Sequence, residues 1–277
     1  MTPPDAPEDA PAPKEHDLAQ HRIHLLGMDG RAGSAFTLPR AFSTPFRPDL
    51  IQRAVVAAQS HRRQPYGTSL TAGARHSVRW SGKGKGVART PRLMDSMRGA
   101  QSPNTVGGRR AHPPKVARIW DKKINRKERQ LAFASALGAT REVKLVTARG
   151  HRVPSGLHLP VVLENPIENI NNSQDARVFL ERLKLWADVT RARDGTHMRS
   201  GRSGRRGRVR HTPRSLLIVI SAAGKARGFQ NLAGVEVVPV PRLSTEDLAP
   251  GGTAGRLTLF SQSAVESLRS RLGEAAA

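Results

Sequence analysis

The 277-residue chain contains no cysteine, so it can form neither a disulfide nor a thiolate metal site. Its longest purely aliphatic run, residues 216–220, is far shorter than the roughly 20 residues that a membrane-spanning helix needs. Apolar residues make up 37% of the chain, which is low for a protein that is compact throughout. Residues 1–20 hold five prolines and five acidic residues, unlike a signal or transit peptide, and are expected to form a disordered acidic tail. These features predict a cytoplasmic protein with no membrane partner and with a part that is not globular.

Acidic residues are also few, and two segments of the chain almost lack them. The chain has 46 Lys and Arg against 22 acidic residues, a net charge of +24. Residues 61–119 hold 13 basic residues and one acid, Asp95, while residues 191–214 hold nine arginines and one acid, Asp194. We therefore predict a nearly neutral globular domain, residues 21–60 and 120–277, with an extended basic internal loop at 61–119 and a second basic insertion at 191–214. So large an excess of positive charge indicates a polyanionic partner.

The composition of the 61–119 segment predicts a loop without a core. It contains eight glycines and five prolines, and its few apolar residues follow neither the strand nor the helix period. A segment of this kind is expected to become ordered only on binding. Its most unusual stretch is SGKGKGVARTPR, residues 81–92. It contains no G-x-x-x-x-G-K-[ST] phosphate-loop motif, and Val87 stands where a G-x-G-x-x-G motif beginning at Gly82 needs its last glycine. Glycine lets the backbone approach RNA closely, and the neighbouring cations neutralise phosphates.

Arginine outnumbers lysine in both basic segments, as expected where forked donors meet phosphates and stack on bases. Three aromatic or imidazole side chains lie among these cations and could stack on bases. The predicted RNA-binding residues are Arg62, Arg63, Tyr66, Arg75, Arg79, Trp80, Lys83, Lys85, Arg89, Arg92, Arg98, Arg109, Arg110, His112, Lys115, Arg118, Arg199, Arg202, Arg205, Arg206, Arg208 and Arg210.

The nearly neutral part shows alternating helix and strand patterns. Helices are predicted at 47–63, 125–137 and 173–186 and from residue 263 onward, and apolar or β-rich runs at 157–163, 215–220, 235–240 and 257–260. Asn125 and Glu128 have the spacing of a helix N-cap and its third residue, and Gly138 is expected to end that helix. The alternation predicts an α/β fold, a three-layer α/β/α domain with a mostly parallel sheet.

Catalytic and metal-binding patterns are weak. His21, His24, His151 and His158 are not accompanied by carboxylates at a known metal-ligand spacing, so no metal and no cofactor are predicted. Catalysis would fall to lone carboxylates such as Glu164 and Asp188, for which structural roles are favoured. The residues alone leave three hypotheses: a structural RNA-binding protein, an RNA-processing or RNA-modifying enzyme or accessory factor, and a general nucleic-acid compaction protein.

Several stretches together resemble a known family. TPFRPDLIQRAVVAAQSHRRQPYGT (44–68), SGKGKGVARTPR (81–92), VGGRRAHPPK (106–115) and NRKERQLAFASAL (125–137) resemble the L-four family of large-subunit ribosomal proteins in its archaeal and eukaryotic form. NLAGVEVVP (231–239) and TEDLAPGGTAGRLTLF (245–260) look like that family's C-terminal half. The resemblance covers residues 21–272. The acidic tail and the lack of a long C-terminal extension depart from eukaryotic members and favour an archaeal source.

The resemblance implies a structural constituent of the large ribosomal subunit rather than an enzyme. It implies that the loop penetrates the large-subunit rRNA, that the protein supports subunit assembly, and that the loop tip lines part of the nascent-peptide exit tunnel. The tunnel-lining candidates are Trp80, Lys83, Lys85, Val87 and Arg89. The implied partners are large-subunit rRNA, other large-subunit ribosomal proteins and the nascent peptide, with no small-molecule substrate.

Overall fold

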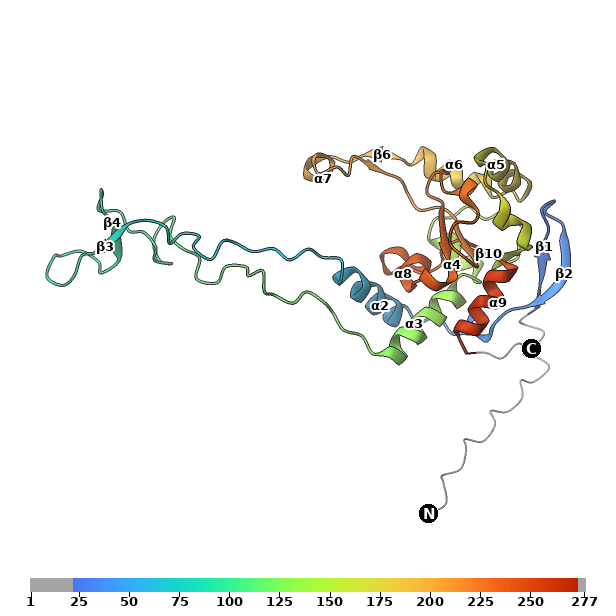
Figure 1. Cartoon of the computed structure of the whole chain (residues 1–277), viewed down its shortest axis with the longest axis horizontal. Coiled ribbons are helices and arrows are strands. Elements are labelled where there is room, and N and C mark those ends of the chain that lie inside the picture. The colour runs from blue at the N-terminus through green and yellow to red at the C-terminus, as the bar shows by residue number, and fades with distance from the viewer. Residues whose placement is uncertain (1–21, 274–277) are drawn as a thin grey trace, which may run out of the picture. The chain divides into compact units, whose positions relative to one another are not determined.

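The computed structural model describes residues 22–273 (Figure 1). The predicted acidic tail, residues 1–20, lies outside these described residues. The chain divides into two compact units. The first, called the globular unit here, runs up to Ala58 and resumes at Lys123, and the second, called the loop unit, comprises residues 59–122.

A six-stranded sheet forms the centre of the globular unit, in the order β2-β1-β5-β10-β8-β9. Its strands are β1 (Arg22–Leu26), β2 (Ala32–Thr37), β5 (Val161–Leu163), β8 (Leu217–Ile220), β9 (Glu236–Pro239) and β10 (Thr258–Ser261). Only the β1–β2 pair is antiparallel, and the other neighbours run parallel. The predicted α/β class with a mostly parallel sheet is therefore confirmed.

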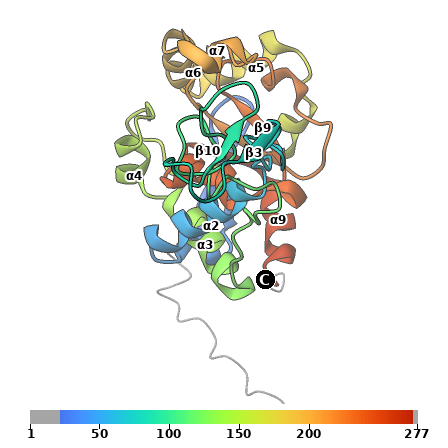
Figure 2. The same ribbon diagram turned by 90° about the vertical axis from the view of Figure 1, so that its left-hand side faces the viewer.

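Two hydrophobic clusters pack on the sheet, because successive strand side chains point to opposite faces. In β8, Leu217 and Val219 belong to one cluster, and Ile218 and Ile220 belong to the other. The first cluster includes side chains of α2 (Pro48–Ser60), α3 (Arg126–Ala139), α8 (Thr245–Leu248) and α9 (Gln262–Arg271). The second includes side chains of α4 (Val143–Ala148), α5 (Ser173–Arg182) and α6 (Trp186–Asp194). Figure 2 shows α5 and α6 well apart from α2, α3 and α9.

Short elements connect this framework. They are η1 (Arg40–Ser43), η2 (Asn165–Asn169), η3 (Arg227–Phe229), η4 (Val240–Arg242) and η5 (Pro250–Gly252). The second basic insertion begins inside α6, and beyond that helix it forms a narrow ribbon of β6 (His197–Met198) and β7 (Arg210–His211) with α7 (Gly201–Arg205) between them.

Two helix ends differ from the sequence prediction. Helix α3 continues through Gly138 to Ala139, so the expected stop at Gly138 is wrong. A Cβ at Gly138 would lie 2.5 Å from the backbone oxygen of Thr44, so the glycine instead permits a close approach of two segments. Asn125 does precede α3, but its side chain makes no capping hydrogen bond.

The helix predicted at 173–186 is divided into α5 and α6. The amide of Leu185 donates to the oxygen of Leu180, and that of Lys184 donates to Glu181, which is the Schellman pattern that ends a helix. Lys184 has a φ of 58°, in the left-handed region that usually requires glycine at this position. The last helix also begins earlier than expected, because Ser261, and not Ser263, accepts a hydrogen bond from the amide of Ala264.

The loop unit contains more local structure than its composition suggested. Strands β3 (Val78–Trp80) and β4 (Pro91–Leu93) pair antiparallel, with Trp80 opposite Pro91. The glycine-lysine stretch forms the turn between them. The two arms of the unit lie side by side, since the amide of Thr68 donates to the oxygen of Pro114 at 3.2 Å. A Cβ at Gly73 would lie 2.7 Å from Cα of Arg109, so only glycine permits this contact between the arms.

Candidate RNA-binding surface

The predicted RNA-binding residues of the loop unit lie at its surface. Each of them is exposed except Arg92, which is half-buried. Residues 62–75 and 109–118 belong to the two arms, and residues 79–98 to the hairpin β3–β4 and its surroundings. The unit therefore presents a high density of cations with Asp95 as the single acid between residues 61 and 119.

The tunnel-lining candidates come together in the β3–β4 hairpin. Trp80 ends β3 and is 69% exposed, while Lys83, Lys85, Val87 and Arg89 lie in the following turn. Gly82, Gly84 and Gly86 have φ values of 71°, 77° and 63°, and a Cβ on any of them would meet no atom within 4 Å. The turn is thus a narrow stretch of backbone with cations on it and nothing packed against its glycines.

Arg92 has a different role from its neighbours in sequence. Its guanidinium donates to the backbone oxygen of Met97 and, at 3.3 Å, to that of Ala88. Ser81 Oγ donates to the same Ala88 oxygen at 3.3 Å. These bonds hold the turn against the hairpin, so Arg92 supports the shape of the tip from within the chain.

A cluster around Trp120 links the two arms of the loop unit. The Tyr66 ring stacks on Trp120 with centroids 5.6 Å apart, and the guanidinium groups of Arg63 and Arg118 lie 4.1 Å and 4.4 Å from the Trp120 centroid. Such contacts combine ring stacking with cation–π attraction. Trp120 Nε1 is buried and has no hydrogen-bond partner in the described chain. The other three residues were predicted from the sequence and Trp120 was not, although an aromatic residue two positions after Arg118 was a usable signal.

The second basic insertion places its arginines on and around the β6–β7 ribbon. Arg202, Arg205, Arg206, Arg208 and Arg210 are exposed, and Arg199 is half-buried. The amide of Arg199 donates to the oxygen of Val209 at 2.7 Å, which closes the ribbon. His197 and His211 face each other across it with ring centroids 5.0 Å apart.

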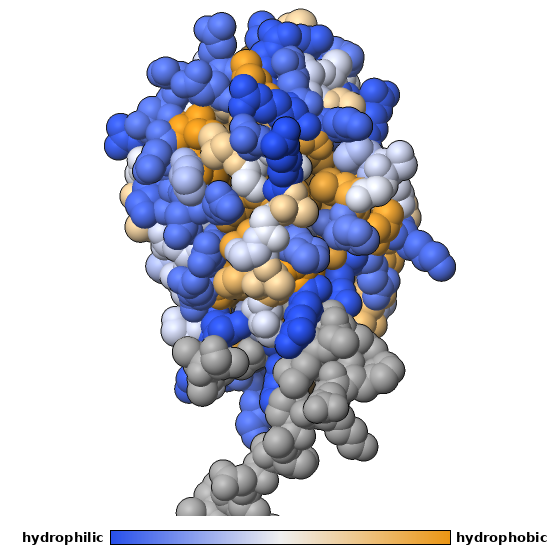
Figure 3. All heavy atoms as spheres, turned by 90° about the vertical axis from the view of Figure 1, so that its right-hand side faces the viewer, coloured by the Kyte–Doolittle hydropathy of each residue, from blue (hydrophilic) through white to orange (hydrophobic). Residues whose placement is uncertain are grey.

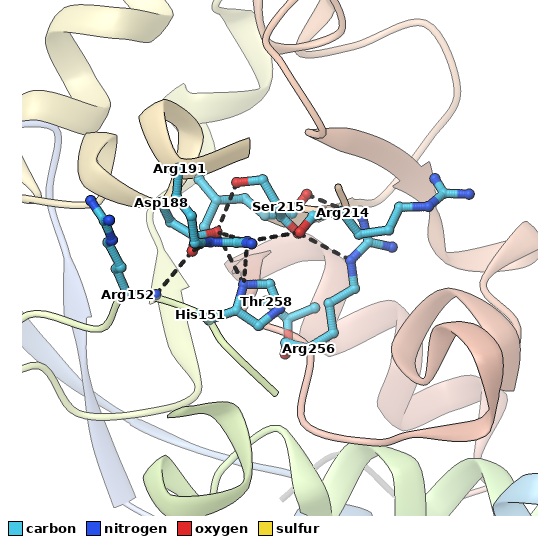
Figure 4. A network of polar contacts seen from close by, with 9 residues as sticks. His151, Arg152, Asp188, Arg191, Arg214, Ser215, Arg256 and Thr258 are labelled. Carbon is cyan, nitrogen blue, oxygen red and sulfur yellow. Dashed lines mark hydrogen bonds and ion pairs between the residues drawn. The ribbon is translucent and has the colours of Figure 1, made fainter. Parts of the chain in front are cut away.

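A buried polar network fixes both ends of this insertion (Figure 4). Asp188 is fully buried and accepts hydrogen bonds from His151 Nδ1 at 3.0 Å, Arg191 Nε at 2.8 Å and Ser215 Oγ at 2.8 Å. Arg191 also donates to the backbone oxygen of Arg214 at 2.9 Å. Burial raises the pKa of Asp188, but the bonds from His151 and Arg191 outweigh it and hold that pKa well below its usual range. The carboxylate therefore joins the residues before the insertion to those after it.

The same network contains serine, histidine and aspartate but is not arranged for nucleophilic catalysis. A catalytic serine must give its proton to the histidine, whereas the Ser215 hydroxyl donates to Asp188 directly. All three residues are buried. Beside them the fully buried Arg256 donates to the oxygen of Ser215 at 3.2 Å and to Glu236 at 2.6 Å. The arrangement is that of a structural ion network.

A second buried carboxylate lies at the carboxyl ends of the parallel strands, where open α/β sheets usually bind ligands. Glu168 accepts hydrogen bonds from the Ser221 amide at 2.9 Å, from Ser261 Oγ at 2.7 Å and from Ser263 Oγ at 2.8 Å, and it pairs with Lys225. Burial raises the pKa of Glu168, but these donors, Lys225 first, lower it to about 2. Its carboxylate oxygens already accept hydrogen bonds from the chain itself, and its low pKa keeps it ionised, so it is a poor general acid or base.

Neither a metal site nor a membrane span is found within residues 22–273. No group of three or more His, Asp or Glu side chains there could hold a metal ion. No helix in this range is long and apolar enough to cross a membrane. Of the histidines considered from the sequence, His151 is buried in the Asp188 network, and His24 approaches the oxygen of Gly33 at 3.3 Å. His21 lies outside the described residues.

Comparison with known proteins places these features in a family. The model of the ribosomal protein L4/L1 family matches residues 36–271. The chain is 42% identical over 256 residues to the large ribosomal subunit protein uL4 of Methanopyrus kandleri, which covers 90% of this chain and 98% of that protein. It is 44% identical over 252 residues to the protein of the same name from Pyrobaculum aerophilum, with coverage of 90% and 89%. For the Halorubrum lacusprofundi protein of that name, identity is 43% over 244 residues, with coverage of 88% and 97%. The chain therefore belongs to the ribosomal protein L4/L1 family, and the resemblance of its motifs to the archaeal and eukaryotic form of that family is confirmed.

Proposed function

We propose that this chain is a structural constituent of the large ribosomal subunit, where it binds large-subunit rRNA and supports assembly of the subunit in the cytoplasm. The observation that carries the proposal is the loop unit, whose exposed cations meet almost no acidic residue, in a chain of a ribosomal protein family. Neutralising phosphates with lysine and arginine releases counterions and favours tight binding to RNA. Other large-subunit proteins are the further partners in this role.

The loop unit is proposed to extend into the rRNA, with the β3–β4 hairpin at the wall of the nascent-peptide exit tunnel. Trp80, Lys83, Lys85, Val87 and Arg89 would then contact rRNA and the nascent peptide. The narrow glycine turn supports this assignment, because it needs little space between RNA helices. The globular unit is proposed to be a three-layer α/β/α domain at the surface of the subunit, supported by the two hydrophobic clusters on its sheet.

Two other groups of residues extend the proposed interface. Trp120 has a buried indole N–H without a partner in the described chain, flanked by two guanidinium groups. Arg63 and Arg118 are exposed, so phosphate oxygens would bind their guanidinium groups beside the ring. The arginines of the β6–β7 ribbon form a separate set of phosphate contacts on the globular unit.

No catalytic role is proposed. The two carboxylates best placed by burial, Asp188 and Glu168, are saturated with donors from the chain itself. An enzyme acting on RNA commonly needs paired carboxylates for metal ions or a titrating acid or base beside the substrate. Structural binding of RNA fits the side chains present.

Site-specific photocrosslinking tests the placement of the hairpin. A photoreactive amino acid would replace Lys83 in one variant and Lys127, an exposed residue of α3, in the other. In ribosomes carrying a stalled nascent chain, the Lys83 variant is expected to crosslink to rRNA and to the nascent peptide, and the Lys127 variant not to the peptide. Crosslinking of the peptide at neither position, or equally at both, would remove the tunnel assignment.

A further inference from the structure

A cavity of about 670 Å³ lies in the globular unit, away from the β6–β7 ribbon. It is bordered by β1, by the segment before β5 and by the end of α5. Strands β1 and β5 pair at a single position, Leu26 opposite Leu163. Toward its amino end β1 pairs only with β2, so the sheet opens there and its interior becomes accessible.

The lining of this cavity has only one sign of charge. Its ionisable residues are Arg22, Arg141, Arg182, Lys184, His24 and His158, and no acidic residue lines it. Two carboxylates lie near the lining. Glu164 stands beside Gly27 and Gly33 of the β1–β2 hairpin. Asp29 is 3.8 Å from Arg182. Both of those side chains are more than half exposed, and an ion pair in that setting is weak. The cavity therefore favours an anion.

The rest of the lining is apolar. Pro154, Leu157 and Leu159 belong to the segment before β5, and Val143 begins α4. The face of the globular unit in Figure 3 likewise intersperses apolar and hydrophilic side chains. A ligand that fits such a lining has a charged group for the cations and a flat or apolar part for the proline and leucine side chains.

Lys184 gives an independent indication that this cavity is a site. It occupies the left-handed position that ends α5, with a φ of 58°, where glycine would be free of strain. A lysine there brings a cation to the rim of the cavity at a cost in backbone strain. Residues held in strained conformations cluster at binding sites.

We propose that this cavity binds one unpaired nucleotide of an RNA chain, with the phosphate on the cations of Arg22 and Lys184 and the base against Pro154 and Leu157. The volume suits a nucleotide, since ligand sites span about 300 to 1,000 Å³. Bases that leave a helix are the usual targets of RNA recognition through pockets. This site rests on the proposed binding of rRNA and adds a separate contact to it, because it uses none of the loop or ribbon cations.

Adenosine 5′-monophosphate serves as the probe, titrated into the full chain and followed by NMR of the histidine imidazole protons. His24 and His158 line the cavity, so their signals report binding there and not at the loop unit. Saturable shifts of both are expected. The double variant Arg22→Ala with Lys184→Gly is expected to weaken the affinity by about tenfold, from the loss of two charge-assisted contacts. The control Arg242→Ala removes an exposed cation outside the cavity and should leave the affinity unchanged.

Two further ligands define the chemistry. Inorganic phosphate and adenosine should each shift the same signals only at much higher concentration than the nucleotide. Equal effects of phosphate and nucleotide would overturn the proposal in favour of a simple anion site. Displacement of the nucleotide by a peptide of residues 1–20 at lower concentration than the nucleotide itself would overturn it in favour of an acidic protein segment. Glycine adopts the left-handed conformation of residue 184 without strain, so the double variant is expected to fold. A lost response at an unfolding temperature no lower than that of the unmodified chain therefore reports lost binding and not misfolding.

Discussion

Buried charges in the globular unit act as connectors between distant parts of the chain. Glu168 joins the segment after β5 to the ends of β8 and β10, and Asp188 joins both sides of the second insertion. Arg256 is fully buried, and burial together with Arg214 lowers its pKa to about 9, so it stays charged at neutral pH. Because each of these groups is compensated inside the fold, removing one partner should be costly.

Glu168 should make the free energy of unfolding fall at acid pH. Its pKa is lowered from 4.5 to about 2 in the folded protein, so its contribution is present above pH 4.5 and is lost as the pH falls toward 2. The shift corresponds to about 3 kcal/mol of unfolding free energy. Urea unfolding of Glu168→Gln should therefore show a lower stability at pH 7 and a flatter decline below pH 4.5. Glu142→Gln, at an exposed position, is the control and should decline like the unmodified chain.

Replacing Asp188 should lower the free energy of unfolding more than replacing Ser215, its neutral hydrogen-bond partner. Asp188→Asn keeps the size of the side chain but leaves the Arg191 guanidinium without its carboxylate, which should cost about 3 to 5 kcal/mol. Ser215→Ala removes one neutral donor to the same carboxylate and should cost about 1 to 2 kcal/mol. If urea unfolding showed the same loss of unfolding free energy for both variants, the ion pair would contribute no more than a neutral hydrogen bond.

At the scale of elements, strands could be predicted from the sequence where every residue of the strand is buried. The apolar run of β8 was recognisable, because a strand buried on both faces carries uninterrupted apolar residues. The β-rich runs of its neighbours, the buried β10 and the half-buried edge strand β9, were recognisable as well. The continuation of α3 through Gly138 was not, since it depends on the close approach of Thr44. The break at Lys184 was not either, because a lysine does not signal the left-handed conformation that ends α5. At the candidate site, charge composition predicted the basic segments. The Trp120 cluster depends on contact between arms that are distant in sequence. The β3–β4 hairpin consists of two strands of three residues, too short to show an alternating pattern.

A substitution at Gly138 shows whether tertiary packing or helix propensity decides the stability at this position. In an exposed helix, Gly→Ala stabilises by about 1 kcal/mol. In α3 the added Cβ would lie 2.5 Å from the Thr44 oxygen, so Gly138→Ala should instead destabilise by about 1 to 3 kcal/mol. Ala134→Gly in the same helix should also destabilise, by about 1 kcal/mol through propensity. A rise in the thermal midpoint of Gly138→Ala would contradict the close approach.

The β6–β7 ribbon should be separable from the fold that carries it. Replacing residues 197–211 by two glycines keeps Arg191, Arg214 and Ser215, which hold the two ends of the insertion. The thermal midpoint should change little, because no core side chain is removed. Binding to rRNA fragments should weaken, and the slope of log K against log salt should become shallower by about 4 to 5 as six arginines are lost. An unchanged slope would show that the ribbon does not contact phosphate.

At the scale of the whole molecule, charge and apolar packing are assigned to different parts of the chain. The globular unit contains both hydrophobic clusters, and the loop unit contributes mainly exposed cations and the narrow β3–β4 hairpin. Packing the loop unit against itself would add little stability, because it has few apolar side chains to bury. Binding becomes favourable when RNA phosphates replace water and counterions around its cations.

Sedimentation of a tagged copy from cells tests this account most directly. Lysate is separated on a sucrose gradient before and after a high-salt wash, beside a variant in which Arg79 to Arg98 are replaced by a short glycine linker. The full chain is expected to stay in the large-subunit peak at one copy per particle after the wash. The variant is expected to remain folded but to be depleted from that peak. Release of the full chain to the top of the gradient, or equal retention of both proteins, would contradict it.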